Sequence, residues 1–194
     1  MLDMKLSLKK RAGALKSEIK AIRRNGNIPA ILYGSGHQPE KIEVPGVEFE
    51  ALLRQLKLKN TPLATKIFEL HIDGANRKAL IKDIQYHPTS YAVEHIDFIV
   101  LEEGKPVTVN VPIQVLGAAE CAGIKLGGTL RQVIRTMKVS CLPEHIPSEF
   151  QIDIRDLGVA QSKRLSDIAV PANVRPLALM KEVAVVVAKA KGAA

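Results

Sequence analysis

A short amphipathic helix that leads directly into a buried strand, over residues 16–34, places the strongest constraint on the fold. Apolar residues recur at helical spacing around its first part, at Leu15, Ile19 and Ile22. Asn25-Gly26 is a typical helix stop, because glycine takes the left-handed backbone conformation without steric cost. The next run, Ile28–Gly34, has the length of one buried strand, with Pro29 near its start, where proline is tolerated. A packed strand therefore carries a short helix at its beginning.

The helix also carries a stripe of positive charge. Lys16, Lys20 and Arg23 are spaced i, i+4 and i+7, so their side chains share one face. Tyr33 follows at the exit of the strand. Cations and one aromatic side chain on a packed element indicate a surface that grips a phosphate backbone. From these residues alone an ordinary solvated helix is the alternative, because Lys and Arg populate most helix exteriors.

The positive charge of the chain is concentrated near its amino end. Residues 1–41 contain nine Lys or Arg against three Asp or Glu, and so carry +6 of the total formal charge of +8. Residues 42–103 contain seven basic and ten acidic residues, a net −3, and residues 104–194 return to +5. A concentration of one sign attracts polyanions from a distance and weakens with salt. The distribution therefore favours a nucleic-acid partner.

Length and strand pattern together predict two β-rich domains. The chain has 194 residues, which is more than one average domain. The run Glu102–Pro106 interrupts the strand pattern, so we place a first domain at 1–101 and a second at 105–194. The expected fold class is mainly β, in the β-rich part of the α+β class.

Strand signals are clearest in the first domain. Alternation predicts strands, and helical spacing predicts a second helix over residues 47–56. The strands are expected at residues 4–8, 41–44, 64–72, 79–85 and 93–101. Asp73-Gly74 lies between two of these runs and is typical of a hairpin turn. In the last strand His95 and Asp97 point to one face, opposite their apolar neighbours.

The second domain is also predicted to be mostly β. Pro112 is expected to divide its first apolar run into two strands, because proline cannot donate to a ladder. The glycine-rich residues 117–128 are expected to form a loop. Further strands are expected at residues 130–142, 150–154, 165–170 and 183–187.

Several classes of protein are disfavoured by the sequence. No apolar run approaches the roughly 20 residues that span a bilayer, and the amino-terminal segment lacks the apolar core of a secretion signal. We therefore expect a cytoplasmic location and no membrane partner. Cys121 and Cys141 lack CxxC spacing and are expected to be reduced. The five histidines show no ligand spacing with them, so no metal or other cofactor is expected.

An enzyme is the alternative from a different class. A small hydrolase would use His95 and Asp97 as an acid–base pair. Such catalysis needs a pocket and a third positioned group, and no Ser or Cys shows a nucleophile signature. The segment Gly123–Gly128 lacks the Gly-Lys-Ser/Thr of a phosphate loop. We therefore expect no catalytic residue and no small-molecule substrate. A pocket that encloses both side chains would favour the hydrolase.

Three blocks of the first domain carry a resemblance to a known family. They read RRNGNIPAILYG over Arg23–Gly34, DIQYHP over Asp83–Pro88 and EHIDF over Glu94–Phe98. The chain closely resembles the bacterial large-subunit ribosomal proteins that bind 5S rRNA, the bL25 family, in the longer two-domain form known as the general stress protein CTC type. GIKLGGTL over Gly123–Leu130 and LSDI over Leu165–Ile168 resemble the second domain of that family. The resemblance thus covers nearly the whole chain.

The resemblance implies both a fold and a set of RNA contacts. The fold is an N-terminal six-stranded antiparallel β-barrel with short helices, followed by a second mostly β domain. The barrel would bind the loop E region of 5S rRNA, among other components of the large subunit. The contacts carried over by position, with Arg24 added for its charge, are Arg11, Lys16, Lys20, Arg23, Arg24, Tyr33, Gln85, His95 and Asp97. Two departures from the family pattern stand at the helix, where Leu15-Lys16-Ser17 replaces Gly-Lys-Gly and Ala21 replaces an arginine.

The leading hypothesis is therefore a non-catalytic structural component of the large ribosomal subunit. A stress-related RNA-binding protein that associates with ribosomes only transiently is a second possibility within the same class of binding.

Overall fold

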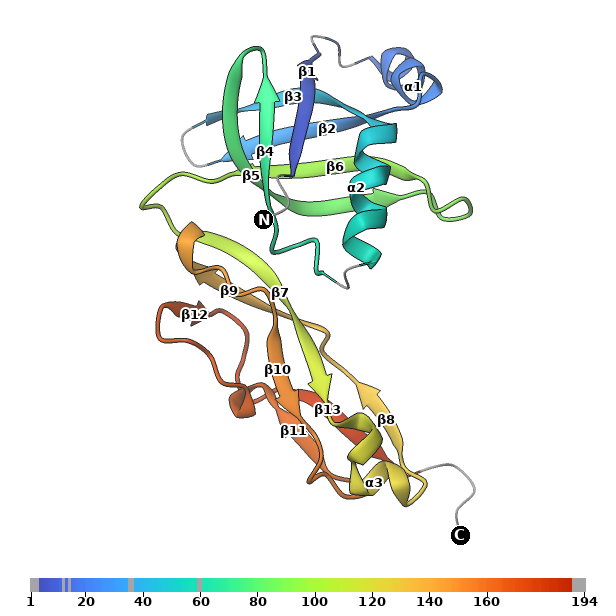
Figure 1. Ribbon diagram of the computed structural model, residues 1–194, viewed down its shortest axis with the longest axis vertical. Coiled ribbons are helices and arrows are strands. Elements are labelled where there is room, and N and C mark those ends of the chain that lie inside the picture. The colour runs from blue at the N-terminus through green and yellow to red at the C-terminus, as the bar shows by residue number, and fades with distance from the viewer. Residues whose placement is uncertain (1–3, 12, 14, 35–36, 59–60, 190–194) are drawn as a thin grey trace. The chain divides into compact units, whose positions relative to one another are not determined.

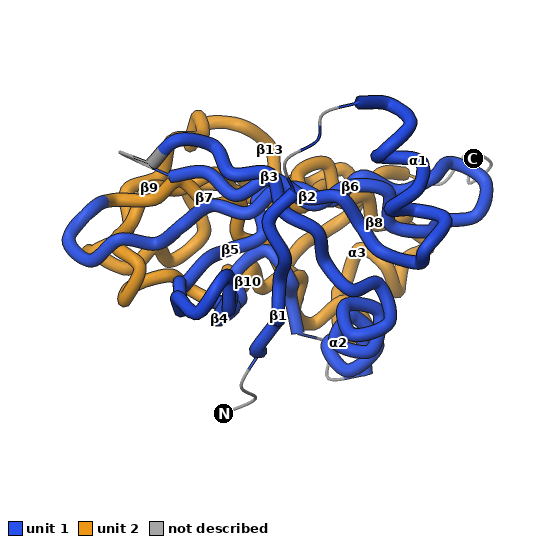
Figure 2. Tube along the Cα trace, turned by 90° about the horizontal axis from the view of Figure 1, so that it is seen from above, with its two compact units in different colours: residues 1–105 blue, residues 106–194 orange. Residues whose placement is uncertain are grey.

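The chain forms two compact units, which are described separately below. The computed structural model describes residues 4–11, 13, 15–34, 37–58 and 61–189. Unit 1 comprises residues 1–105 and unit 2 comprises residues 106–194 (Figure 2). Most regular elements are strands (Figure 1), which confirms the predicted β-rich class.

Unit 1 is a closed barrel of six strands with two helices. Its elements are β1 (Lys5–Lys10), α1 (Lys16–Arg24), β2 (Asn27–Gly34), β3 (His37–Pro45), α2 (Gly46–Leu58), β4 (Ile67–Ile72), β5 (Ala75–Tyr86) and β6 (Val93–Val100). Around the barrel the strands are ordered β1-β3-β2-β6-β5-β4. The predicted six-stranded barrel is therefore confirmed, and both predicted helices are present.

The expectation that this barrel is antiparallel needs one correction. Four neighbouring pairs are antiparallel, but β1 pairs with β4 and β2 pairs with β6 in parallel. Strands joined by short turns pair antiparallel, as in the hairpin of β4 and β5. The two parallel pairs join strands that are distant in sequence and bring the sheet to closure, which removes its free edges.

The core of unit 1 lies inside the barrel and continues beneath α2. Alternate residues of every strand point inward, including Leu32, Ile96 and Phe98, and all three are at most 1% exposed. The helix α2 contributes Phe49 and Leu56 to the same cluster. It follows directly on β3 and so closes the barrel end at which β2 and β6 begin (Figure 1).

The opposite end of the barrel is closed by charged side chains. Lys10, Glu40 and Arg77 pair with inward-facing residues of neighbouring strands, so they also point toward the barrel axis. Arg77 Nη1 donates to Glu40 Oε1 at 2.8 Å, and Lys10 Nζ lies 3.4 Å from Glu40 Oε2. Lys10 also pairs with Asp73, in the turn between β4 and β5, at 3.5 Å. We call these four residues the end network.

Unit 2 contains two small sheets. Its helical elements are η1 (Ala118–Glu120), α3 (Ala122–Lys125), η2 (Pro143–His145) and η3 (Leu165–Asp167). Its strands are β7 (Val107–Leu116), β8 (Thr129–Gln132), β9 (Thr136–Cys141), β10 (Phe150–Asp153), β11 (Ser162–Arg164), β12 (Val174–Pro176) and β13 (Val183–Ala188). One sheet has the order β10-β7-β9-β12 and the other the order β11-β13-β8. Cys121 and Cys141 are free and buried.

Four expectations for unit 2 are wrong in detail. The strand predicted at residues 130–142 is divided into β8 and β9, which belong to different sheets. Pro112 does not divide two strands but lies inside the continuous strand β7. It is the last residue of β7 that pairs with β9, and the pairing with β10 begins at Ile113. The N–H that proline lacks is therefore not needed for the pairing with β10. In the strand predicted at residues 165–170, residues 165–167 form the single turn η3 and residues 168–170 have no regular structure. Asp167 Oδ2 accepts from the Arg164 N–H at 2.9 Å, a local bond that favours a turn over a strand. The glycine-rich segment 117–128 includes η1 and α3 as well as loop.

Candidate nucleic-acid interface

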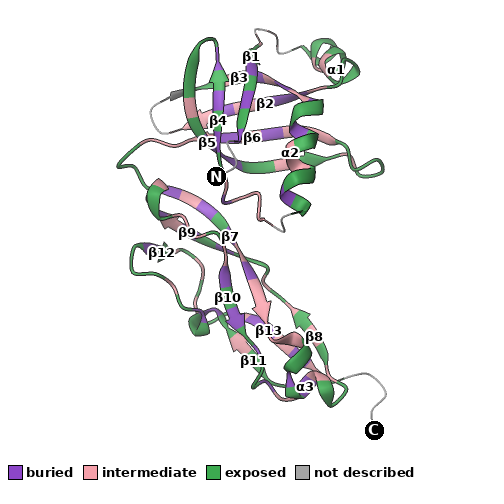
Figure 3. Cartoon of the chain, viewed as in Figure 1, coloured by how far each residue is buried: buried purple, intermediate pink, exposed green. Residues whose placement is uncertain are grey.

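The helix α1 stands on the outside of the barrel with little of its surface covered. Figure 3 shows the helix as mostly exposed, and none of its residues is buried; only Ile19 and Ile22 are half-buried. The helix contacts β2. Its amino end is capped by Glu18, whose carboxylate accepts from the Leu15 N–H at 3.3 Å. A nine-residue helix is marginal on its own in water, so its few contacts with the barrel hold it in place.

Arg23 fixes the carboxyl end of α1 to the barrel. Its Nε and Nη2 both donate to the main-chain oxygen of Glu94, at 3.3 and 3.1 Å. Glu94 lies in β6, directly before His95, so the end of the helix is held beside that residue. The three cations of the predicted stripe, Lys16, Lys20 and Arg23, are exposed, and so is Arg24. The predicted cationic stripe is therefore present on the surface, and Arg23 has a structural contact as well.

Four of the predicted contact residues lie on one face of the sheet. Gln85 on β5 pairs with His95 on β6, and Asp97 on β6 pairs with Ile31 on β2, so these side chains share the outside of the barrel. Tyr33 follows two residues after Ile31 and shares its side of the strand. We call Tyr33, Gln85, His95 and Asp97 the outer sheet face.

His95 and Asp97 interact directly on this face. His95 Nδ1 lies 2.9 Å from Asp97 Oδ1, and the two side chains are 17% and 31% exposed. The carboxylate orients the imidazole and leaves Nε2 as the ring nitrogen that is available to another molecule. Partial burial raises the pKa of the Tyr33 hydroxyl, and the negative charges of Asp97 and Asp83 raise it further. Tyr33 is therefore a neutral hydrogen-bond donor at neutral pH.

Arg11 belongs to neither of these two groups and lies in the segment between β1 and α1. It is half-buried just beyond the end of β1, where its N–H donates to the Lys41 carbonyl at 3.0 Å. Its guanidinium folds back, and Nη1 donates to the Gly13 carbonyl at 3.1 Å. The structure thus places eight of the nine predicted residues on α1 and the adjoining sheet, and it places Arg11 between β1 and α1, beside Lys41 of β3.

The sequence did not single out Lys41, which extends the outer sheet face by one strand. Lys41 on β3 pairs with Ile31 on β2, which in turn pairs with Asp97 on β6, so all three side chains point outward. Lys41 is exposed. Its strand was predicted, but its place beside β2 depends on the pairing register, which no local pattern specifies.

The geometry around His95 and Asp97 does not favour the hydrolase. A hollow lies beside α2, and its lining includes Tyr86 and Tyr91 but neither member of this pair. Among the described residues, no three His, Cys, Asp or Glu side chains are grouped so as to hold a metal ion.

Comparison with known proteins identifies the family. Residues 6–98 match the Ribosomal L25p family, and residues 106–191 match the C-terminal domain of ribosomal protein TL5. The large ribosomal subunit protein bL25 of Chlamydia trachomatis serovar L2 is 44% identical over 186 residues, which cover 96% of this chain and 100% of that protein. The chain belongs to the bL25 family. Proteins of the same description from Chlamydia abortus and Chlamydia pneumoniae are 44% and 41% identical over the same shares of both chains.

Membership of the bL25 family, in its two-domain CTC-type form, confirms the resemblance inferred from the sequence motifs. It makes the chain a structural protein of the large ribosomal subunit, associated with that particle and its RNA. The family is one of ribosomal proteins rather than enzymes, which disfavours the hydrolase hypothesis. Membership also favours a constituent of the large subunit over a protein that associates with ribosomes only transiently. In the part of the chain that the structure describes, no helix has both the length and the apolar character needed to cross a bilayer.

Proposed function

We propose that this protein binds 5S rRNA in its loop E region, through α1 and the outer sheet face, as part of the large subunit of cytoplasmic ribosomes. The observation that carries the proposal is the pair of hydrogen bonds from Arg23 to the Glu94 carbonyl. These bonds set the cationic helix beside the polar side chains of β6. The cations of α1, which suit phosphates, and the polar side chains of the outer sheet face, which suit bases or sugars, therefore lie next to each other on one surface.

Each part of this surface suits a different part of folded RNA. Lys16, Lys20 and Arg24 are exposed cations that neutralise phosphates and set the register of the complex without reading bases. A-form RNA presents 2′-hydroxyls and base edges in a wide, shallow minor groove. The outer sheet face offers donors and acceptors to such a groove. Asp97 is compatible with a polyanion here because it is paired with His95 and can accept from a hydroxyl or an amino group.

The proposal is tested by comparing 5S rRNA with an unrelated RNA duplex of equal length over a range of salt concentrations. We expect tighter binding to 5S rRNA, with an affinity that falls steeply as salt rises. Replacing His95 with Ala should reduce the preference for 5S rRNA more than it reduces binding to the unrelated duplex. Equal affinity of the unchanged protein for both RNAs would refute the proposal, and an equal loss for both in the variant would remove His95 from the specific contacts.

A further inference from the structure

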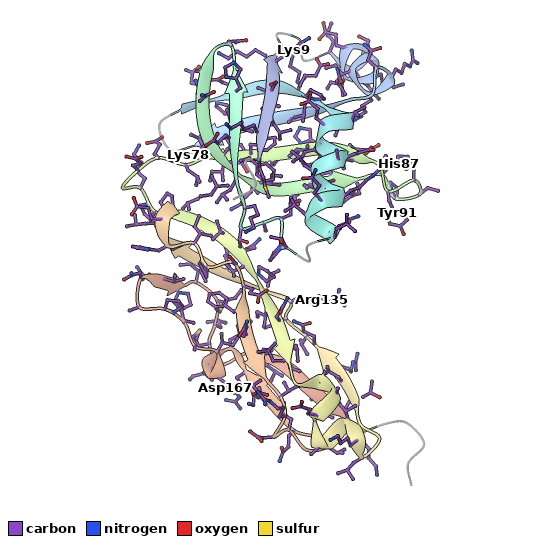
Figure 4. The ribbon with its side chains drawn as sticks, in the orientation of Figure 1. Lys9, Lys78, His87, Tyr91, Arg135 and Asp167 are labelled. Carbon is purple, nitrogen blue, oxygen red and sulfur yellow. The ribbon has the colours of Figure 1, made fainter. Side chains whose placement is uncertain are left out.

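The loop that joins β5 to β6 projects beyond the barrel and carries a tyrosine in an unfavourable backbone conformation. Tyr91 has φ of 56°, in the left-handed region that bulky side chains rarely adopt. Its side chain is 78% exposed, so no burial in the protein compensates for the strain. Figure 4 labels Tyr91 and His87 on this loop. A strained and exposed aromatic residue of this kind points to a role outside the folding of the chain.

Hydrogen bonds within the loop hold Tyr91 in position. The Tyr91 N–H donates to the His87 carbonyl at 2.9 Å, and the His87 N–H donates to the Ala92 carbonyl at 2.8 Å. The His87 ring accepts at Nδ1 from the N–H groups of Thr89 and Ser90, at 3.3 and 3.2 Å. The loop is therefore ordered before any ligand arrives, which lowers the entropic cost of binding.

Tyr91 stands over a hollow between the loop and α2. The hollow has a volume of about 160 Å³. Leu53 and Val93, which pack against the barrel core, form part of its apolar lining, and Tyr86 and Tyr91 also line it. An apolar cavity of about 150 Å³ accommodates a ring the size of benzene. This hollow is open on one side, so a flat ring larger than benzene can enter it in part and leave its outer edge in solvent.

The lining of the hollow has a net positive charge, from Arg54 and Lys57 against the single carboxylate of Glu50. Arg54 and Lys57, on successive turns of α2, both line it. Arg54 pairs with Glu50 at 3.9 Å, but the two side chains are 81% and 54% exposed, so this is a weak surface pair. The structure assigns no ion pair to Lys57 within the residues it describes. A planar ring linked to a negative group matches this combination of aromatic walls and cations.

We propose that this hollow binds one unpaired nucleotide of RNA, with its base against Tyr91 and Tyr86 and its phosphate at Arg54 and Lys57. The proposal rests on the proposed function for its RNA partner. Successive residues of β5 point to opposite faces of the hairpin, so the Gln85–His95 pair and the Tyr86–Val93 pair lie on different faces. An extra residue in β6 separates the two pairs. RNA that lies on the outer sheet face meets the first pair, and a nucleotide that passes the tip of the hairpin reaches the second. The stacking contact tolerates any base, since every base has a π-face.

The first test is the affinity of the full chain for 5S rRNA, with substitutions at Tyr91. Tyr91→Ala should weaken binding on the order of tenfold, whereas Tyr91→Phe should retain it, because stacking on one base depends on the ring. Leu58→Ala, a change at an exposed apolar residue of α2 that does not line the hollow, should have no effect. Tyr91→Ala binding as tightly as the unchanged protein would overturn the proposal and leave the hollow to a protein partner.

A second measurement separates a binding role from a structural one. Tyr91→Gly relieves the strained backbone, because glycine adopts positive φ freely, so Tm should be unchanged or higher while the affinity for RNA falls. A lower Tm together with unchanged affinity would show that the tyrosine serves the fold. Lys57→Gln should weaken RNA binding more than Lys78→Gln. Lys78 is the control because it lies near the start of β5, whereas the hollow is at the end of that strand, at Tyr86 (Figure 4).

A third measurement keeps the two proposals distinguishable. The chain contains no Trp and three Tyr, of which Tyr86 and Tyr91 line the hollow and Tyr33 lies on the outer sheet face, so the difference in quenching between the unchanged protein and a variant without Tyr86 and Tyr91 reports contact in the hollow. Single-stranded oligoadenylate should quench this emission in the unchanged protein and quench it less in Tyr91→Phe/Tyr86→Leu. If the protein shows no preference for 5S rRNA but this quenching is observed, the proposed function fails and the nucleotide site stands. If the preference is observed without Tyr91-dependent binding or quenching, the nucleotide site fails alone.

Discussion

Glu40 occupies an inward-facing position of β3, where a carboxylate needs partners to replace the water that it loses. The side chains of Arg77 and Lys10 provide them, and the end network thereby closes the barrel opposite α2. The hydrogen bond from Arg77 holds the pKa of Glu40 below its ordinary value of 4.5, against the opposing effect of burial. The charged form is therefore favoured more in the folded chain than in the unfolded one.

This lowered pKa predicts how the end network responds to pH. The stability that Glu40 contributes should be fully present above pH 4.5 and should be lost as the pH falls through the lowered folded pKa. Glu40→Gln should reduce the free energy of unfolding at pH 7 by about 1 kcal/mol. Urea denaturation of both proteins from pH 7 to pH 2 would measure this, and the difference should shrink at the acidic end. A difference in the free energy of unfolding that stays constant over the whole pH range would show that the charge of Glu40 does not contribute to stability.

At the same residue scale, the sequence predicted the outer sheet face only in part. Strand alternation places His95 and Asp97 on one side, and the complete burial of Ile96 and Phe98 confirms that choice. The position of Lys41 could not be predicted, because it depends on which strands are neighbours and in what register. The Arg23 contact with Glu94 was equally hidden, since 71 residues separate them in the chain.

Among the elements, α1 shows most clearly which features the local sequence predicts and which depend on tertiary contacts. Its observed end at Arg24 agrees with the stop predicted at Asn25-Gly26, because apolar spacing and a helix stop are local features of the sequence. The strand predicted at 165–170 failed for a local reason too, because the Asp167 side chain bonds the main chain there and favours a turn. The element against which α1 packs could not be predicted from its sequence, because none of its residues is buried and the packing signal is therefore weak.

The docking of α1 yields a prediction that separates its two roles. Arg23→Ala removes both bonds to the Glu94 carbonyl, so the amide hydrogens of α1 should exchange about five- to tenfold faster. Lys20→Ala removes one exposed charge and should leave exchange unchanged. Both variants should bind 5S rRNA more weakly, and Arg23→Ala should lose more because the helix is also misplaced. Hydrogen exchange followed by mass spectrometry, with RNA titrations beside it, measures both effects. Unchanged exchange in Arg23→Ala would show that other contacts hold the helix.

At the scale of the whole molecule, everything proposed to touch RNA belongs to unit 1. The helix α1, the outer sheet face and the hollow beside α2 all lie within residues 1–105. Unit 2 has buried side chains of its own, including Val111, Met137 and Val139, which are fully covered within its first sheet. Its net charge of +4 permits contact with RNA or with other proteins of the subunit. We propose that the two units are separately folding domains.

Separate expression of residues 1–105 and 106–194 tests this division of roles. Each fragment should unfold cooperatively by itself, because its apolar side chains are buried by its own strands. The first fragment should bind 5S rRNA with nearly the affinity and the salt dependence of the full chain, since the cations of α1 and the outer sheet face are intact. The second fragment should bind isolated 5S rRNA no better than an unrelated duplex, and instead should be needed for full occupancy on reconstituted large subunits. If the first fragment folds but binds 5S rRNA far more weakly than the full chain, then residues 106–194 contribute directly to the RNA contact and the surface defined on unit 1 is incomplete.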